Sequence, residues 1–448
     1  MRLLYRLLYR CSRFGHRRWR WAQRRFSRAG LAVLGAFILV VLLAPDTDNN
    51  LTYQALPLLL GLLVAAVCLS RFFKAPFSAS RVLPRFGTAG CPLGYQVVVK
   101  NLSRRVQNGL SLLENMADPW PSFAEWLAVQ RAEQKVLHSF RVSGRRPLNP
   151  FKVARVKDAS VPAMAPGQEV EARVELTPLR RGILRFTGLT LARPDPFGIY
   201  RALTTVPLPQ TVLILPKRYL LPAVGLPGTA KYQQGGVALA ASVGQSEEYV
   251  ALRDYRHGDP LRHIHWRSWA RVGRPVVKEF EDEFFVRHAL VLDTFTDEAH
   301  SEVFEEAVSL AASFACTLPT QESLLDLLFV GPQSYCFTAG RGVAHVEQML
   351  EILASVRVCS DQPFRALEHL VLGHVSVVSG CICVLMAWDD ERQGFIRKLR
   401  ALGIPVLILV IVPPGESGKV EPGPLCDEPD RFFVLEAGQI ELGLAKLR

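Results

Sequence analysis

The sequence lacks the motifs of several common enzyme classes. Its nine cysteines include no CxxC pair, which excludes a zinc ribbon, and their odd number argues against a disulfide framework. No GxSxG elbow is present, so the usual serine-hydrolase motif is missing. Residues 415–419 (GESGK) lack the earlier glycine of a P-loop, and Val420 stands where Ser or Thr would hold magnesium. The sequence therefore predicts reduced thiols, as in the cytosol, and no nucleotide bound by the chain itself.

Acidic residues are absent from residues 1–28, which contain ten arginines. The formal net charge is +12, so the remaining 420 residues carry only about +2. The arginines recur every three or four residues along one helical face, and Leu3, Leu4, Leu7 and Leu8 fall on the other side. This pattern predicts a basic amphipathic helix on anionic lipid headgroups. The alternative is a disordered arm that only orients the protein, and a nucleic-acid-binding arm is not expected because an apolar run follows.

That apolar run belongs to residues 29–73, which contain two apolar stretches joined by the turn PDTDNN. They predict a transmembrane hairpin of two helices, in which the first span begins near Trp21 to reach the roughly 20 residues that a bilayer needs. Basic residues flank the hairpin on both sides, and its loop is acidic. The positive-inside rule then places both ends in the cytoplasm. We therefore expect a membrane protein with its soluble domains on the cytoplasmic side.

The soluble part is long enough for more than one domain. At 448 residues, 49% hydrophobic and 21% charged, the chain exceeds one compact core. Residues 78–216 alternate short runs rich in Val, Ile, Leu and aromatic residues with turns, which predicts a β-sandwich. Its expected strands are 95–100, 170–176, 182–191 and 212–215. Residues 118–150 interrupt this rhythm with Trp120 and Trp126 near a plausible helix.

Residues 286–448 alternate buried strands with amphipathic helices. Such alternation predicts a parallel sheet with helices on both faces, and functional loops at the carboxyl ends of its strands. Asp293 and Asp389 both follow strands of this kind. The expected strands are 289–293, 324–330, 381–387, 405–412 and 432–435, and the expected helices are 302–318, 346–356 and 393–402.

Residues 217–285 form a linker and an Arg/Trp-rich segment. Within 245–283, seven basic residues face eight acidic ones, a balance that does not suit a nucleic-acid groove. Paired charges beside several aromatic residues indicate either a structural ion-pair network or a recognition surface. His257, His263 and His265 suggest a metal site, but a third and fourth ligand are not fixed, and hydrogen-bonded structural histidines are the alternative.

The sequence DTFTD at residues 293–297 follows the first strand of the predicted sheet. An acid at a strand end, followed by alternate hydroxyl residues, can hold a hard cation through oxygen ligands. Phe295 occupies a position where a hydroxyl would be needed. The alternative is a loop that caps the next helix.

Several of these residues together resemble the bacterial domain of unknown function 58 family. The resemblance rests on Gly258-Asp259, Arg262, Ile264-His265-Trp266, Ala270-Arg271, residues 279–281, the strand 290–293, Arg181-Gly182 and the run DPFGIY at 195–200. A membrane hairpin before a β-rich region also resembles this family, so the likeness covers nearly the whole chain.

The resemblance implies a particular fold and partner. Family members are similar in their C-terminal part to von Willebrand factor A domains, which are of Rossmann type and bind partners through a divalent cation. Their genes commonly accompany a MoxR-type AAA+ ATPase and transglutaminase-like membrane proteins. The adhesion motif has an aspartate and two alternate serines. This chain keeps Asp293 but has Phe295 and Asp297 at the serine positions. The resemblance thus implies a degenerate Mg²⁺ site at Asp293, Asp297 and Asp389.

The sequence and this resemblance together predict a multidomain protein of the bacterial inner (cytoplasmic) membrane, with a hairpin anchor, a β-sandwich and a von Willebrand factor A-like α/β domain. Its expected function is a membrane-anchored adaptor or scaffold without catalysis, which works with a MoxR-type ATPase in assembly, maturation or envelope-related processes. The alternative is a metal-dependent hydrolase at the cytoplasmic membrane surface that uses His257, His263, His265 and Asp293. The expected partner-binding residues are Arg253, Tyr255, Gly258, Asp259, Arg262, His265, Trp266 and Arg271.

Overall fold

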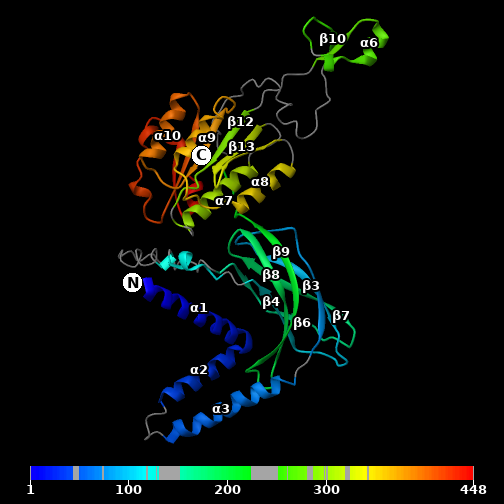
Figure 1. The fold of residues 1–448 in the computed structure, drawn as a ribbon, viewed down its shortest axis with the longest axis vertical. Coiled ribbons are helices and arrows are strands. Elements are labelled where there is room, and N and C mark those ends of the chain that lie inside the picture. The colour runs from blue at the N-terminus through cyan, green and yellow to red at the C-terminus, as the bar shows by residue number, and fades with distance from the viewer. Residues whose placement is uncertain are drawn as a thin grey trace. The chain divides into compact units, whose positions relative to one another are not determined.

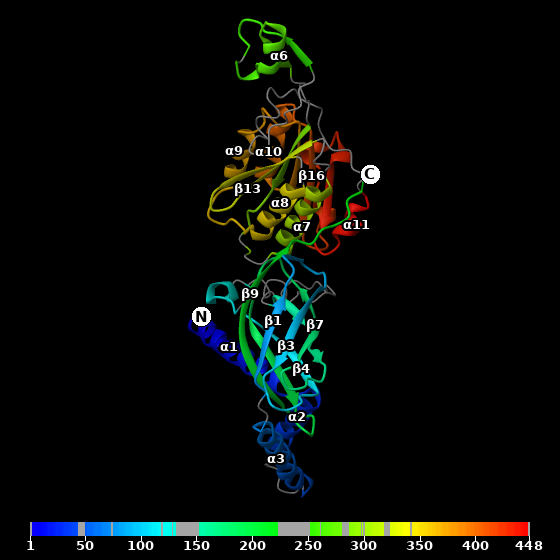
Figure 2. The ribbon, with the colours of Figure 1, turned by 90° about the vertical axis from the view of Figure 1, so that its right-hand side faces the viewer.

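The chain folds into two units, Met1–Lys217 and Arg218–Arg448 (Figure 1, Figure 2). This computed structural model describes residues 2–43, 50–72, 75–117, 120–127, 129–130, 152–222, 251–259, 261–279, 286–296, 298, 301–317, 323–340 and 343–446. Each unit has its own secondary structure and its own hydrophobic core.

Three helices open the first unit: α1 (Arg2–Arg25), α2 (Arg28–Leu43) and α3 (Asn50–Ser70). Among the described residues, none of the helices has the length and apolar character that crossing a membrane requires, so the predicted transmembrane hairpin is wrong. The 16 residues of α2 extend about 24 Å at 1.5 Å per residue, against a hydrocarbon core of about 30 Å. The early turns of α3 contain the polar Gln54 and the helix-breaking Pro57.

The first apolar helix does not extend back to Trp21, because the helix is interrupted between α1, which ends at Arg25, and α2, which begins at Arg28. Phe26 forms an antiparallel bridge with Tyr200, and the Ser27 backbone N–H donates to the Ile199 carbonyl at 3.0 Å. The Ser27 hydroxyl accepts from the Gly30 N–H at 2.9 Å and so caps α2. The expected DPFGIY motif thus forms the turn against which the α1–α2 junction packs.

The rest of the first unit consists of two sheets that share one core, seen as two layers in Figure 1. One sheet has the order β1-β3-β7-β5 and the other β2-β9-β8-β4-β6. Burial alternates residue by residue in β3 and β7, as a strand with one face on a core requires. The strands are β1 (Phe77–Val82), β2 (Phe86–Thr88), β3 (Leu93–Asn101), β4 (Leu110–Met116), β5 (Ala154–Val156), β6 (Ala159–Val161), β7 (Glu169–Pro178), β8 (Gly182–Pro194) and β9 (Arg201–Leu215).

The second unit contains a six-stranded sheet of order β14-β13-β12-β15-β16-β17. Its strands are β12 (Val286–Leu292), β13 (Ser323–Val330), β14 (Ser334–Ala339), β15 (Gly380–Leu385), β16 (Val406–Val412) and β17 (Phe432–Glu436). Five strands are parallel, but β14 pairs antiparallel with β13. The wholly parallel sheet expected from the sequence is therefore corrected to a mixed sheet, and the expected von Willebrand factor A-like domain is not confirmed. A short turn after Val330 sends the chain straight back along β13, where a parallel strand would need a crossover.

Helices cover both faces of this sheet. The core on one face includes Leu367 of α9 and Phe395 of α10, whereas α7 packs on β12, β15 and β16 from the other. Every residue of β15 and β16 is buried, because both faces of these strands are covered. The helices are α7 (Glu302–Thr317), α8 (Val343–Ser355), α9 (Arg365–Leu372), α10 (Asp390–Ala401) and α11 (Ile440–Leu444).

Candidate functional site

The Arg/Trp-rich segment folds into a small element, residues 251–279, which we call the Arg/Trp subdomain. Strands β10 (Ala251–Asp254) and β11 (Val276–Glu279) pair antiparallel, and between them lie the 3-10 turn η1 (Leu261–His263) and helix α6 (Trp266–Val272). Ile264, Val276 and Val277 are buried, and Ile264 bridges to Val277. The His265 N–H donates to the Val276 carbonyl at 2.8 Å. These contacts set the helix against the hairpin.

An ion pair between Arg253 and Asp259 closes the turn after β10. The Asp259 carboxylate accepts from both Nη atoms of Arg253 at 2.7 and 2.8 Å, and from the Arg256 backbone N–H at 2.8 Å. These hydrogen bonds lower the pKa of Asp259 to about 2. Gly258 has φ +104°, a backbone conformation that residues with a side chain rarely adopt. Four of the expected partner-binding positions therefore lie together, Arg253 in β10 and Tyr255, Gly258 and Asp259 in the segment that follows it, where the Tyr255 N–H donates to the Pro275 carbonyl at 3.0 Å.

Two of the three histidines of the subdomain, His263 and His265, have hydrogen-bond partners. The Arg262 Nε donates to His263 Nε2 at 3.3 Å, and His265 Nδ1 lies 2.7 Å from the Ser268 hydroxyl at the start of α6. Among the described ranges, no group of three or more His, Cys, Asp or Glu is arranged to hold a metal ion. His263 and His265 thus form hydrogen bonds within the protein, which agrees with the interpretation of these residues as structural histidines.

The outer surface of the subdomain combines apolar and arginine side chains. Leu261, Trp266 and Val272 have exposed fractions of 67%, 64% and 52%, and Trp266 stacks on Trp269 with ring centroids 5.1 Å apart. Four arginines, Arg256, Arg262, Arg267 and Arg271, are exposed, and so is Arg274, which forms an ion pair with Asp254. Residues 251–279 contain seven basic and three acidic residues, so this element carries a net positive charge. Most of the acids that balanced the count in the sequence lie outside the described residues.

The second candidate site is the sheet edge at Asp293. Asp293 follows β12 and is fully buried, and its carboxylate lies 2.7 Å from Nε of Arg392. Nη1 of Arg392 contacts Asp389 at 2.5 Å, so the structure brings Asp293 and Asp389 together around one guanidinium. Asp389 also caps α10 by accepting from the Arg392 N–H at 3.0 Å. The third expected ligand, Asp297, lies outside the described residues.

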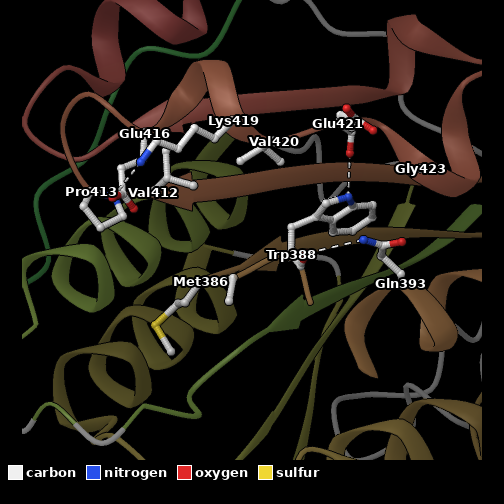
Figure 3. Close-up of a pocket in the computed structure, with 11 residues that line it drawn as sticks. Met386, Trp388, Gln393, Val412, Pro413, Glu416, Lys419, Val420, Glu421 and Gly423 are labelled. Atoms are coloured by element: carbon white, nitrogen blue, oxygen red, sulfur yellow. Dashed lines mark hydrogen bonds and ion pairs between the residues drawn. The ribbon is translucent and has the colours of Figure 1, made fainter. Parts of the chain in front are cut away.

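A pocket of about 460 Å³ lies beyond the carboxyl ends of β15 and β16 (Figure 3). Trp388 lines this pocket and donates from Nε1 to the Glu421 carbonyl at 2.8 Å. Gln393 donates to the Trp388 carbonyl at 3.4 Å, and Lys419 pairs with Glu416 at 3.7 Å. The GESGK sequence thus contributes to the rim of this pocket. Carboxyl ends of parallel strands are where α/β sheets bind ligands.

The sequence interpretation missed Arg392 and Trp388. Arg392 stands three residues after Asp389, and an acid followed by a base at this spacing on a helix was the available signal. Its second partner, Asp293, is 99 positions away, and no local pattern indicates that contact.

Comparison with known proteins supports part of the resemblance. Residues 251–414 match the model of a family described as "Protein of unknown function DUF58". Over 207 residues the chain is 26% identical to "Uncharacterized protein YeaD" of Bacillus subtilis (strain 168), covering 45% of this chain and 50% of that protein. The chain therefore spans about half the length of this relative.

Two solved structures show weak likeness over 32% of the chain. One is the CARDB domain of the PF1109 protein from Pyrococcus furiosus in complex with di-metal ions, 91% covered, with 14% identity and a TM-score of 0.17. The other is the ASH / PapD-like domain of human CEP192, 91% covered, with 10% identity and a TM-score of 0.18. TM-scores this low carry no argument about fold or function.

Proposed function

We propose that this chain is a protein-binding adaptor without catalytic turnover, which acts at the cytoplasmic surface of a bacterial membrane. The observation that carries the proposal is the surface of the Arg/Trp subdomain, where Trp266 and Leu261 lie exposed together with four arginines. Trp and Arg are enriched among the residues that contribute most to protein–protein binding. A small, internally tied element with an apolar and cationic outer face suits recognition of a protein surface.

The proposed partner presents acidic groups to this surface. Arg253 is neutralised by Asp259, and Arg274 pairs with Asp254 at 3.1 Å. Arg256 and Arg262 form no ion pair with an acid among the described residues, and exposed arginines of this kind favour association with the carboxylates of a partner through complementary charge. The family resemblance suggests a MoxR-type AAA+ ATPase as this partner, whose ATP would supply the energy for assembly or maturation.

Membrane association is proposed to come from α1. One face of this helix packs against other residues of the first unit, where the ring of Tyr9 contacts the rings of Trp120, Phe123 and Trp126. The rest of its surface carries exposed arginines and the exposed Leu4 and Leu7. Arginine beside exposed leucine suits an anionic lipid surface, to which each arginine contributes about 1 kcal/mol.

Partner binding is tested with the full chain and a purified MoxR-type ATPase from the same cell. We expect Arg262→Glu to weaken co-purification strongly, because it places a carboxylate against an acidic surface. Arg397→Glu is the matched control, since Arg397 is exposed on α10 outside the subdomain. Binding that is equally strong in wild type and Arg262→Glu would count against this surface, and absence of any ATPase binding would count against the partner.

Lipid binding is tested by flotation of the full chain with vesicles. Wild type is expected to float with phosphatidylglycerol vesicles and much less with phosphatidylcholine vesicles. Replacing Arg10 and Arg13 by Gln should weaken binding by about 2 kcal/mol, roughly 30-fold. Gln at Arg173 and Arg185, which are exposed on strands, should change little. Flotation that ignores both lipid charge and the α1 arginines would contradict the proposal.

A further inference from the structure

The carboxylate of Asp293 is occupied on both oxygens by donors of this chain. Oδ1 accepts from the Phe295 N–H at 3.0 Å. Oδ2 accepts from the Met386 N–H at 3.1 Å and from Nε of Arg392 at 2.7 Å. The residue is fully buried, so water does not compete for these positions. Three of the roughly four lone-pair sites of a carboxylate are thus filled.

The guanidinium of Arg392 is likewise held on every nitrogen. Besides Asp293, it donates from Nη1 to Asp389 at 2.5 Å and from Nη2 to the Phe295 carbonyl at 3.4 Å. Its carbon lies 4.8 Å from the centroid of the Phe364 ring, and the side chain is only 7% exposed. The planar group therefore bridges both acids and the strand-end loop, which a mobile surface arginine would not do.

We infer that Arg392 supplies the positive charge of this sheet edge in place of a divalent cation, so that the edge takes no Mg²⁺, Mn²⁺ or Ca²⁺ ion while Arg392 is present. A cation between Asp293 and Asp389 would have to displace the guanidinium or stand against its charge. The neighbouring hydroxyl, Thr294 Oγ1, is buried and donates to the Val330 carbonyl at 2.5 Å. The residues that the structure describes at this edge therefore do not fit the cation that an adhesion-type site requires.

The charge of Arg392 persists across the physiological pH range. Burial acts against the charged guanidinium, but the charges and hydrogen bonds of Asp293 and Asp389 outweigh it and raise the pKa of Arg392. The arginine can therefore act as a permanent counter-ion. Partner contacts at this edge would then need no metal and would not respond to chelators.

The experiment measures Mn²⁺ bound to the full chain at neutral pH, by loss of the free-ion electron paramagnetic resonance signal. Wild type and Asp293→Asn are expected to bind equally little Mn²⁺ at about 1 mM, the range of weak protein sites. Arg392→Gln leaves two acids without their counter-ion and is expected to bind one Mn²⁺ tighter by about 10- to 100-fold. The added Asp293→Asn change should remove this new site.

Two results would overturn the inference. One is a stoichiometric Mn²⁺ site in wild type that disappears in Asp293→Asn. The other is an Arg392→Gln protein, folded by circular dichroism, that binds no more Mn²⁺ than wild type. If either variant fails to fold, Asp389→Asn keeps the test decisive, because the Asp389 side chain is 50% exposed. Wild-type Mn²⁺ binding that depends on Asp389 would then overturn the inference, and equal weak binding would support it.

Discussion

Both Nη atoms of Arg253 contact the two carboxylate oxygens of Asp259, at 2.7 and 2.8 Å. This bidentate pair ties β10 to a turn that the backbone N–H of Arg256 closes on the same carboxylate. Bidentate arginine–carboxylate pairs add geometric definition as well as energy. The turn that exposes Arg256 is therefore held by one ionised acid.

Removing Arg253 should raise the pKa of Asp259. The hydrogen bonds from Arg253 and the Arg256 N–H lower this pKa to about 2, below the usual value of about 3.9. Because the pKa is lowered on folding, the stability that this carboxylate contributes is present above about pH 3.9 and is lost as pH falls towards 2. In Arg253→Gln we expect the pKa of Asp259 to rise part of the way towards its usual value, since the Arg256 N–H still donates to the carboxylate. NMR titration of the Asp259 carboxyl carbon measures this pKa. Arg274→Gln, the control, should leave Asp259 unchanged, and an equal shift in both would contradict the assignment.

The buried pair of Arg81 and Glu114 should be a large contributor to the first unit. Its N···O distance is 2.7 Å and its side chains are 0% and 1% exposed. Arg81→Met should lower the free energy of unfolding by about 3–5 kcal/mol, because it leaves a buried carboxylate without a counter-charge. Lys157→Met removes an exposed pair with Glu175 and should cost under about 1 kcal/mol. Urea unfolding measures both, and equal losses would disprove this ranking.

The loss in Arg81→Met should also depend on pH. Burial already raises the pKa of Glu114 against the opposing influence of Arg81. Without Arg81, the folded protein holds the proton of the Glu114 carboxyl group more tightly than the unfolded chain does. The free energy of unfolding of the variant therefore falls as the pH rises through the range in which carboxyl groups ionise. We expect a smaller deficit at pH 4 than at pH 7.

Two glycines of α2 should respond oppositely to alanine. A Cβ on Gly30 would overlap the Ile199 carbonyl oxygen, whereas a Cβ on Gly35 meets nothing within 4 Å. Gly30→Ala should destabilise the junction of α1 and α2 by about 1–3 kcal/mol through overpacking. Gly35→Ala should be neutral or stabilise by up to about 1 kcal/mol, because alanine favours helix. Thermal unfolding of the full chain separates them, and a stable Gly30→Ala variant would mean that this contact is not maintained.

Local patterns in the sequence were sufficient for most strands and helices of the second unit. The apolar runs 324–330 and 405–412 correspond closely to β13 and β16, because strands covered on both faces are continuously apolar. The periodic segment 302–318 corresponds to α7. Strand β14 was missed because its residues are mostly exposed and do not alternate between buried and exposed positions.

The decisive side-chain contacts could not be predicted in the same way. Arg81 meets Glu114 across 33 positions, and Arg392 meets Asp293 across 99. Pairs this distant depend on which strands become neighbours, which periodicity does not reveal. The first span of the predicted hairpin failed for a related reason: the apolar run alone did not show that the bridge of Phe26 with Tyr200 and the cap by Ser27 would separate α1 from α2.

Trp266 should contribute to partner binding far more than to folding. Its side chain is 64% exposed and stacks on Trp269, so Trp266→Ala should change the free energy of unfolding by about 0.5 kcal/mol or less. If the Arg/Trp subdomain binds the proposed ATPase, the same change should weaken binding at least about tenfold, or 1.4 kcal/mol. Leu402→Ala is the control, because Leu402 is an apolar residue of similar exposure, 57%, outside the subdomain. Fluorescence anisotropy with labelled ATPase measures the affinities. Equal affinity for the Trp266 and Leu402 variants would show that the exposed tryptophan is not part of the interface, since only a residue buried by the partner loses contacts on truncation.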